Sequence, residues 1–374
     1  MAVAVERRTL AQLPDRVASL SGYDHEVFTS IMAVSVEVAE LRSDTLLLDK
    51  LRLSNQPVFK IHNLREHIVA KINGARVLKP EEPINVSESD AEMKKKLESD
   101  IKDKEGQDPF CLVNFEAKTP LNVFGRVRGK SSATGANLYP ASKFHAVLPA
   151  AVHHPCTPPT RDQCLDELDV ADRFYEAAHR ADDRAIYSSY GRNNLDKAGA
   201  SIWEHGHAQL QQEIGCHEGV MEELLDVFHT YRWRTGRDYF QDLFRAHQVV
   251  GLGVERSGVM VMPYLTPLGN RHIRMLAYAF DEPQRDVLFR ILHHFMDDEG
   301  FGAKAFNFTI VYRPISYDGR DWGGMPAIIA DILDRGDITK RNNDVGFSER
   351  LLRSPITATD PYRANDGIEQ ALAA

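Results

Sequence analysis

The sequence has few cysteines, no long apolar run and no excess of positive charge, and each shortage excludes a class of protein. Its four cysteines, in a chain of 374 residues, form no C-x-x-C pair and are too few for a disulfide framework. No apolar stretch approaches the roughly 20 residues that a membrane-spanning helix needs. The formal net charge of −9 argues against a nucleic-acid or anionic-membrane partner, because phosphate groups attract basic surfaces.

What remains is a soluble globular protein with reduced thiols. With 43% hydrophobic residues, the chain is long enough to bury a sizeable core. The N-terminal stretch "MAVAVERRTLAQLPDRV" lacks the apolar centre of a signal peptide, so we expect a cytoplasmic location. The charge still permits a ligand of nucleotide size.

The pattern along the chain divides it into three parts. Residues 1–107 form a mixed region that ends in a charged segment, 79–107, which we expect to be a solvated helix or insertion outside the core. In residues 108–250, strand-like runs surround a helix that is predicted from the apolar spacing over 162–182. A second helix is predicted over 218–233.

The last part, 251–374, repeats this order of elements. Strands are predicted at 258–265, 272–280 and 304–314, with a helix over 282–296. A duplicated unit would explain this order.

The stretch "GASIWEHGHAQL", Gly199–Leu210, places two histidines and a glutamine at every second position. Positions two apart share one face of a strand but not of a helix, so the stretch predicts a strand that aims polar side chains at one spot. The small residues between them, Gly206 and Ala208, would let the opposite face pack closely. The turn-rich segment before it predicts an antiparallel partner strand.

Together with "ANLYPASKFHAVLPAAVHHP" upstream, the segment "YGRNNLDKAGASIWEHGHAQL" resembles the nucleotidyltransferase branch of the histidine-triad superfamily. That branch includes galactose-1-phosphate uridylyltransferase, sugar-nucleotide phosphorylases and diadenosine tetraphosphate phosphorylases. The resemblance covers roughly Asp108 to Pro314. It implies an α+β fold with an antiparallel sheet, flanking helices and two related halves, of which 251–374 would be the degenerate one, without H-x-H. It also leaves room for a homodimer.

The resemblance further implies an enzyme that moves a nucleoside monophosphate through a covalent nucleotidyl-histidine. The donor would be a nucleoside diphosphate-sugar or a dinucleotide, and the acceptor phosphate or a sugar phosphate. A neutral imidazole suits this role, because its ordinary pKa of about 6.5 leaves a free lone pair near neutral pH. The implied catalytic residues are His207 as nucleophile with His205 and Gln209 beside it, and the implied substrate-binding residues are Gly199, Ser201 and either Asn193 or Asn194.

The sequence departs from these relatives in two places. Where some of them hold zinc with a C-x-x-C pair, this chain has "DPFC", so Cys111 has no cysteine partner and we expect no metal ligand among the site residues. The chemistry itself requires no cofactor, although a divalent metal stays open. Ser201 stands four residues before His205, where many relatives have three, and Glu204 precedes that histidine. This second departure favours the phosphorylase side of the family.

Two alternatives remain from the sequence. The spacing of His205, His207 and Glu213, followed by His272, resembles the two metal motifs of cupins. In a cupin, these four residues would bind an iron, manganese or zinc ion. The other alternative is a non-catalytic nucleotide-binding protein on the same fold. His153 and His154 are interpreted as the surface end of a strand, and His293 and His294 as structural helix residues.

Overall fold

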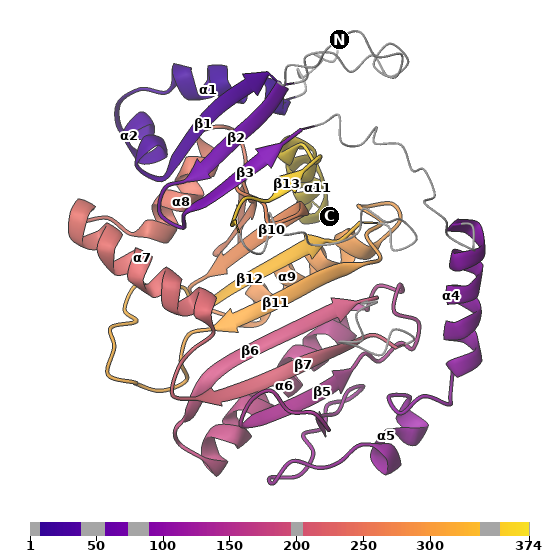
Figure 1. Cartoon of the computed structure of the whole chain (residues 1–374). Helices are drawn as coiled ribbons and strands as arrows, with labels where there is room; N and C mark the ends of the chain where they lie inside the picture. The colour runs from indigo at the N-terminus through magenta and orange to yellow at the C-terminus, as the bar shows by residue number, and fades with distance from the viewer. Residues whose placement is uncertain (1–7, 39–56, 74–89, 196–204, 337–351, 374) are drawn as a thin grey trace.

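In the part of the chain that the structure describes, an antiparallel sheet of nine strands forms the centre of the molecule (Figure 1). The computed structural model describes residues 8–38, 57–73, 90–195, 205–336 and 352–373. In sheet order the strands are β4 (Gly135–Ala136), β5 (Phe144–Pro149), β7 (His207–Ile214), β6 (Ala185–Asn194), β11 (Phe306–Tyr312), β12 (Ile328–Asp334), β10 (Asn270–Ala277), β9 (Val259–Pro263) and β8 (Val254–Arg256).

A smaller sheet combines strands from both ends of the chain. It contains β1 (Met32–Val38), β2 (Pro57–Asn63), β3 (Ile68–Ile72) and β13 (Ile356–Thr357), with β13 parallel to β3. The helices are η1 (Leu10–Gln12), α1 (Leu13–Ser19), α2 (Gly22–Ile31), α4 (Asp90–Lys104), α5 (Leu112–Lys118), α6 (Arg161–Ala181), α7 (Gly219–Thr235), α8 (Tyr239–Gln248), α9 (Glu282–Met296) and α11 (Pro361–Ala373). None of the helices in the described ranges is long and apolar enough to cross a membrane.

The long helices lie where the apolar spacing predicts them. The expected 282–296 matches α9, in which the predicted face is buried, and α6 and α7 begin and end within two residues of prediction. Thr160 and Gln163 form a capping box at the start of α6, which satisfies backbone N–H groups that the first turn leaves unpaired.

The two faces of the large sheet are covered differently. One face packs against α6, α9 and α11 in the main apolar core, to which β7 contributes Ala208 and Leu210. The other face of β9, β10, β11 and β12 joins a second core with α7, α8 and the small sheet. On β7, that second face carries His207 and Gln209 at alternate positions.

The sequence predictions for two segments need correction. The expected strand over the H-x-H stretch begins only at His207, so His205 lies before it, and residues 196–204 lie outside the described residues. The charged 79–107 segment does contain a largely solvated helix, α4, but it is not wholly outside the core. Its Leu97 and Ile101 are buried against Leu195 and Ala305.

Candidate active site

His207 is the first residue of β7, and its ring is held in one tautomer. Its Nδ1 lies 3.1 Å from the backbone oxygen of His205. Because a carbonyl only accepts hydrogen bonds, Nδ1 carries the proton and Nε2 keeps a free lone pair. Burial lowers the pKa of His207 to about 4, so the ring is neutral near pH 7. The ring of Phe110 packs edge-on against it, with centroids 4.7 Å apart.

Gln209 lies two residues along the same strand, and its amide oxygen is already occupied. Asn137 Nδ2 donates to Gln209 Oε1 at 2.9 Å, and His145 Nε2 lies 2.8 Å from the same oxygen. The backbone N–H of Ala141 donates to His145 Nδ1 at 2.9 Å, so the ring proton is on Nε2 and points at Gln209. The amide NH₂ of Gln209 is therefore turned away from these two donors.

The opposite face of the H-x-H stretch explains its small residues. A Cβ on Gly206 would lie 2.6 Å from Arg192 Nη2, and Arg192 is buried behind the strand. Ala208 lies in the main core. The prediction that Gly206 and Ala208 permit close packing is confirmed.

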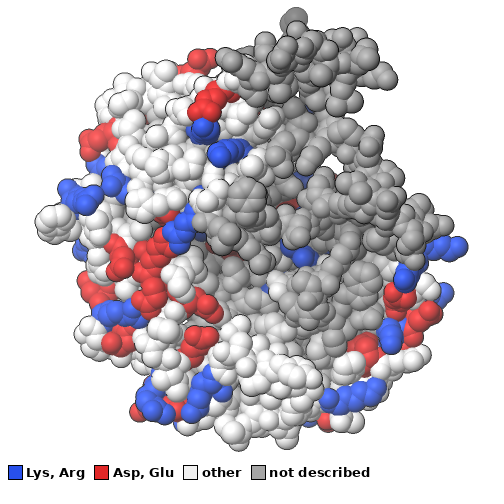
Figure 2. Space-filling view, viewed as in Figure 1, with Lys and Arg blue, Asp and Glu red and all other residues white. Residues whose placement is uncertain are grey.

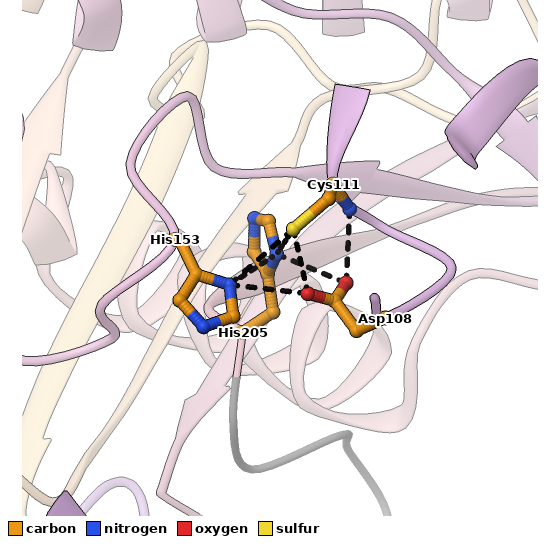
Figure 3. A group of neighbouring side chains, drawn as sticks. All are labelled: Asp108, Cys111, His153 and His205. Atoms are coloured by element: carbon orange, nitrogen blue, oxygen red, sulfur yellow. Dashed lines mark hydrogen bonds and ion pairs between the residues drawn. The ribbon is translucent and has the colours of Figure 1, made fainter. Parts of the chain in front are cut away.

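The side chain of His205 points to a different group of residues from that of His207. Its Nδ1 is 3.2 Å from Asp108 Oδ1, and its Nε2 is 3.0 Å from the backbone oxygen of Ala150. It belongs to a compact group with Asp108, Cys111 and His153, in which one potential ligand atom from each residue lies within 4.8 Å of the others (Figure 3).

The donor atoms of this group face one another. Asp108 Oδ2 is 2.8 Å from Cys111 Sγ and 3.1 Å from His153 Nδ1, and the two Nδ1 atoms of His153 and His205 are 3.3 Å apart. Each ring turns its Nε2 to a backbone oxygen, that of Ile101 for His153. The Nε2 atoms therefore hold the protons, and both Nδ1 lone pairs point at the carboxylate and the sulfur.

A tetrahedral cation fits this arrangement. Lone pairs of one oxygen, one sulfur and two nitrogens repel one another when buried together, and a divalent ion such as Zn²⁺ takes this donor set. Without an ion, burial and the nearby Asp108 carboxylate raise the pKa of Cys111 to about 11. The sequence prediction considered only cysteine pairs, so it overlooked Asp108 in the place of a second cysteine.

The structure places the other predicted substrate-binding residues differently from one another. Gly199 and Ser201 lie outside the described residues. The side chain of Asn193 is exposed, and the alternation of β6 places it on the same face as Gly191, which pairs with Gln209. Asn194 is buried, and its Nδ2 donates to the backbone oxygens of Pro155 and Lys304, so it is a structural residue.

The cupin alternative is wrong. Four strand-to-strand steps separate the strand of His207 from that of His272, in the order β7-β6-β11-β12-β10, which is about 19 Å at ordinary strand spacing. His272 bonds to Asp331 instead. Glu213 is near the far end of β7 from His207, so these side chains do not converge.

Sequence reasoning missed five residues of this site: Asp108, Phe110, Asn137, His145 and His153. Three of them, Asn137, His145 and His153, lie inside the upstream stretch that carried the family resemblance. His153 was interpreted as a surface residue, whereas it is half-buried in the cluster. A search for D-x-x-C beside the H-x-H motif would have signalled the cluster.

Comparison with known proteins rests on structure alone, since no family model and no curated protein matches this sequence. ADP-glucose phosphorylase from Arabidopsis thaliana, solved with bound ADP-glucose, superposes with a TM-score of 0.57 and 16% identity, over 90% of this chain and 98% of that one. A GalT-like protein from Arabidopsis thaliana gives 0.52 and 17%, over 71% and 92%. A uridylyltransferase mutant gives 0.52 and 12%, over 71% and 93%. The chain therefore shares its fold with these phosphorylase and uridylyltransferase structures.

Proposed function

We propose that the protein transfers a nucleoside monophosphate from a nucleoside diphosphate-sugar or a dinucleotide to phosphate or a sugar phosphate, through a covalent bond to His207. The observation that carries this proposal is the pairing of a buried, neutral His207, with its free Nε2, and an amide of Gln209 whose oxygen is already bonded. His207 can act as the nucleophile, and the N–H groups of the Gln209 amide can donate to a phosphate oxygen.

In the first step, the Nε2 lone pair of His207 attacks the α-phosphorus of the donor. The bond from that phosphorus to the bridging oxygen breaks, and the leaving group takes the electron pair and departs as a sugar phosphate or, from a dinucleotide, as a nucleoside phosphate. The ring becomes cationic as the phosphorus–nitrogen bond forms. The hydrogen bond from Nδ1 to the His205 carbonyl strengthens with that charge and stabilises the intermediate.

In the second step, an acceptor phosphate oxygen attacks the same phosphorus, and the electron pair of the phosphorus–nitrogen bond returns to Nε2. Negative charge builds on the phosphoryl oxygens in both steps. The NH₂ of Gln209 would donate to one of them, and a donor fixed before the reaction needs no reorganisation as the charge develops.

The nucleoside end of the donor would lie toward β4 and β5. Leu138 and Tyr139 directly follow Asn137 and are 68% and 88% exposed, which offers apolar and aromatic surface for stacking a base beside the phosphate site. Asn137 adds an amide near the same place. The identity of the base is not part of the proposal.

The cluster of Asp108, Cys111, His153 and His205 would hold a divalent ion, with zinc the best match to its donors. The ion would join the 108–111 segment to the loop after β5 and to the start of β7, and so fix the backbone carbonyl that orients His207. Its role in this proposal is structural, and each chemical step uses only the residues named above.

Two related halves are a further part of the proposal, and the sheet supports it. The first half runs β5-α6-β6-β7 along the chain with sheet order β5-β7-β6, and the second runs β10-α9-β11-β12 with the mirrored order β11-β12-β10. His207 pairs with Pro149 at the end of β5, as Ile328 pairs with Ala277 at the end of β10. An isoleucine thus stands where the first half has its nucleophile.

The test is intact mass after incubation with a panel of ADP-, GDP-, UDP- and CDP-glucose and of dinucleoside polyphosphates. We expect one donor to add the mass of its nucleoside monophosphate. Initial rates at several acceptor concentrations should then give parallel double-reciprocal lines, because the first product leaves before the acceptor attacks. Binding without any adduct or turnover would instead support the non-catalytic alternative, and intersecting lines would exclude the covalent route.

A further inference from the structure

Arg192 on β6 places a buried guanidinium directly behind the start of β7. The residue is 3% exposed, and its Nη2 would lie 2.6 Å from a Cβ on Gly206, the residue before His207. Because neighbouring Cα atoms are about 3.8 Å apart, the guanidinium lies within roughly 8 Å of the His207 Cα. Charges inside a protein are screened less than charges in water, so the Arg192 charge acts over this distance.

The hydrogen bonds of Arg192 within the described ranges do not neutralise its charge. Nη2 donates to the amide oxygen of Asn194 at 3.3 Å, and Nε has no partner among the described residues. The ring of Phe306 lies 5.8 Å from the guanidinium carbon. A buried arginine usually bonds to a carboxylate, whereas these neighbours are a neutral amide and an aromatic ring.

Glu167 on α6 is a buried carboxyl that interacts with the Arg192 charge. Its Oε2 accepts a hydrogen bond from the Tyr190 hydroxyl at 3.5 Å, and its Oε1 has no partner among the described residues. Burial raises the pKa of Glu167 to about 7, and the Arg192 charge opposes that rise. Below pH 7 most of Glu167 is therefore protonated, so it does not cancel the positive charge of Arg192.

The intermediate of the proposed reaction adds a second positive charge near the first. When the α-phosphorus bonds to Nε2 of His207, Nδ1 keeps its proton, because it donates that proton to the His205 carbonyl. The nucleotidylated ring is then cationic, whereas the free ring is neutral. Nδ1 faces the backbone, so Nε2 and the attached phosphoryl group lie on the side of the ring away from Arg192. The repulsion between the two cations therefore outweighs the attraction of Arg192 for the phosphoryl oxygens.

We propose that Arg192 is a positioning residue that acts through His207: its buried charge destabilises the nucleotidyl-histidine, so the nucleotide passes on to the acceptor instead of remaining on the enzyme. This inference rests on the proposed function and deepens it. Arg192 alternates with Tyr190 on the core face of β6, and His207 is on the opposite face of the sheet, so Arg192 touches neither donor nor acceptor. Its charge raises the free energy of the intermediate relative to the free enzyme.

The experiment measures the equilibrium of the first step. The enzyme is mixed with the nucleoside diphosphate-glucose that labels the wild type and with graded concentrations of glucose 1-phosphate, and intact mass gives the labelled fraction at equilibrium. Arg192→Met keeps a long side chain without the charge, so we expect the equilibrium constant for adduct formation to rise about tenfold. Arg192→Lys keeps the charge and should stay within about threefold of wild type.

Glu167→Gln changes the charge behind β7 in the opposite direction. At pH 8, above its pKa of about 7, Glu167 is largely ionised and offsets part of the Arg192 charge. The neutral amide of the variant removes this offset. We therefore expect the equilibrium constant for adduct formation at pH 8 to fall about threefold.

Thermal unfolding separates the effect of charge from an effect of packing. If Arg192→Met and Arg192→Lys lower the Tm but keep the wild-type equilibrium constant, or raise that constant equally, Arg192 acts through packing and the inference is overturned. If Arg192→Met does not fold, Glu167→Gln decides, and an equilibrium constant that does not fall at pH 8 overturns the inference. If the wild type forms no adduct with any donor, the proposed function itself fails.

Discussion

At the residue scale, the two histidines of the H-x-H motif have different surroundings although they are two positions apart. His207 donates one hydrogen bond, to the His205 carbonyl, and its Nε2 has no hydrogen bond to a residue in the described ranges. Both nitrogens of His205 are engaged, one with Asp108 and one with the Ala150 carbonyl. The ring of His207 can therefore react, while the ring of His205 holds the backbone carbonyl that orients His207.

His145 should matter through Gln209 alone. His145→Ala removes one of two donors to the Gln209 oxygen and lets the amide rotate, so we expect kcat to fall about tenfold with a smaller change in KM. His145→Gln keeps an N–H donor at a similar reach and should recover part of this loss. Steady-state kinetics with one donor and saturating phosphate would measure both variants.

The matched comparison is Gln209→Ala, which removes the amide itself and should cost more than either variant. An equal loss in His145→Ala and His145→Gln, together with a lowered Tm in both, would show that His145 acts through packing and would contradict the positioning role.

The residues that sequence could identify at this scale are those whose signal is local. The two-residue spacing of His207 and Gln209 predicts a shared face of a strand, and they share one. Asn137 and His145 reach Gln209 from 72 and 64 residues away, and no spacing rule encodes such a contact. The same is true of Asp108 and His205, which are 97 residues apart.

At the element scale, the start of β7 is fixed from both sides. Arg192 lies against Gly206 behind the strand, and the Asp108 cluster holds His205 in front of it. Gly206→Ala would bring a methyl group to 2.6 Å from Arg192 Nη2, so the guanidinium or the strand must move. We expect a loss of about 1–3 kcal/mol in the free energy of unfolding, measured with urea, and a loss of activity.

A glycine on a more open element gives the control for that variant. A Cβ on Gly219, at the start of α7, would meet no atom within 4 Å, so Gly219→Ala should change stability little. Equal effects of the two substitutions would contradict the close approach of Arg192 to β7.

The metal cluster predicts about one equivalent of zinc per chain, measured by elemental analysis of the purified protein. Asp108→Cys should keep the ion, because it restores a common zinc donor, whereas Asp108→Ala and His153→Ala should bind it roughly 10–100-fold more weakly or worse. Both alanine variants should also lower the Tm, since binding of the ion couples to folding. Wild-type protein that takes up no zinc, even when zinc is supplied, would contradict the assignment.

Helices and strands could be predicted where the signal lies within the sequence of the element itself. The apolar faces of α6 and α9 and the β-branched and aromatic runs of β6 and β11 are visible in short windows of sequence, and the structure has a helix or a strand at each. The small sheet was not predicted, because β13 pairs with β3 across about 285 residues and contains only two residues. Tertiary packing, not local pattern, decides such an element.

At the scale of the whole molecule, a buried carboxyl makes stability depend on pH. Burial raises the pKa of Glu167 from 4.5 to about 7, against the opposing effect of the Arg192 charge. Between these values the folded protein keeps a proton that the unfolded chain has released, so the free energy of unfolding falls as pH rises from about 4.5 to 7 and then levels off.

Glu167→Gln cannot ionise and should lack this decline. Relative to wild type, the variant should gain about 1–3 kcal/mol in free energy of unfolding between pH 5 and pH 8, measured by urea unfolding at both values. Parallel pH profiles of the two proteins would mean that Glu167 is already ionised in the folded state at pH 5.

The whole fold also determines which face of the sheet can react. Helices α6, α9 and α11 close one side of the large sheet, and the second core closes the other side over β9, β10, β11 and β12. The polar face around His207 is therefore on the part formed by β5, β7 and β6 (Figure 1). In the view of Figure 2, acidic and basic side chains are interspersed over the described surface, and no large area of one sign is visible. A small anionic substrate would be selected by this local face rather than by a broad field.

The most direct measurement is the intact mass of His207→Gly beside wild type, each incubated with the same donor. We predict that the wild type gains the mass of one nucleoside monophosphate and that His207→Gly gains none. We also predict that the variant still passes the nucleotide from a preformed nucleoside phosphoimidazolide to phosphate, because the supplied imidazole replaces the missing ring. An adduct that persists in His207→Gly, or a wild type that turns over without one, would contradict the central role of His207.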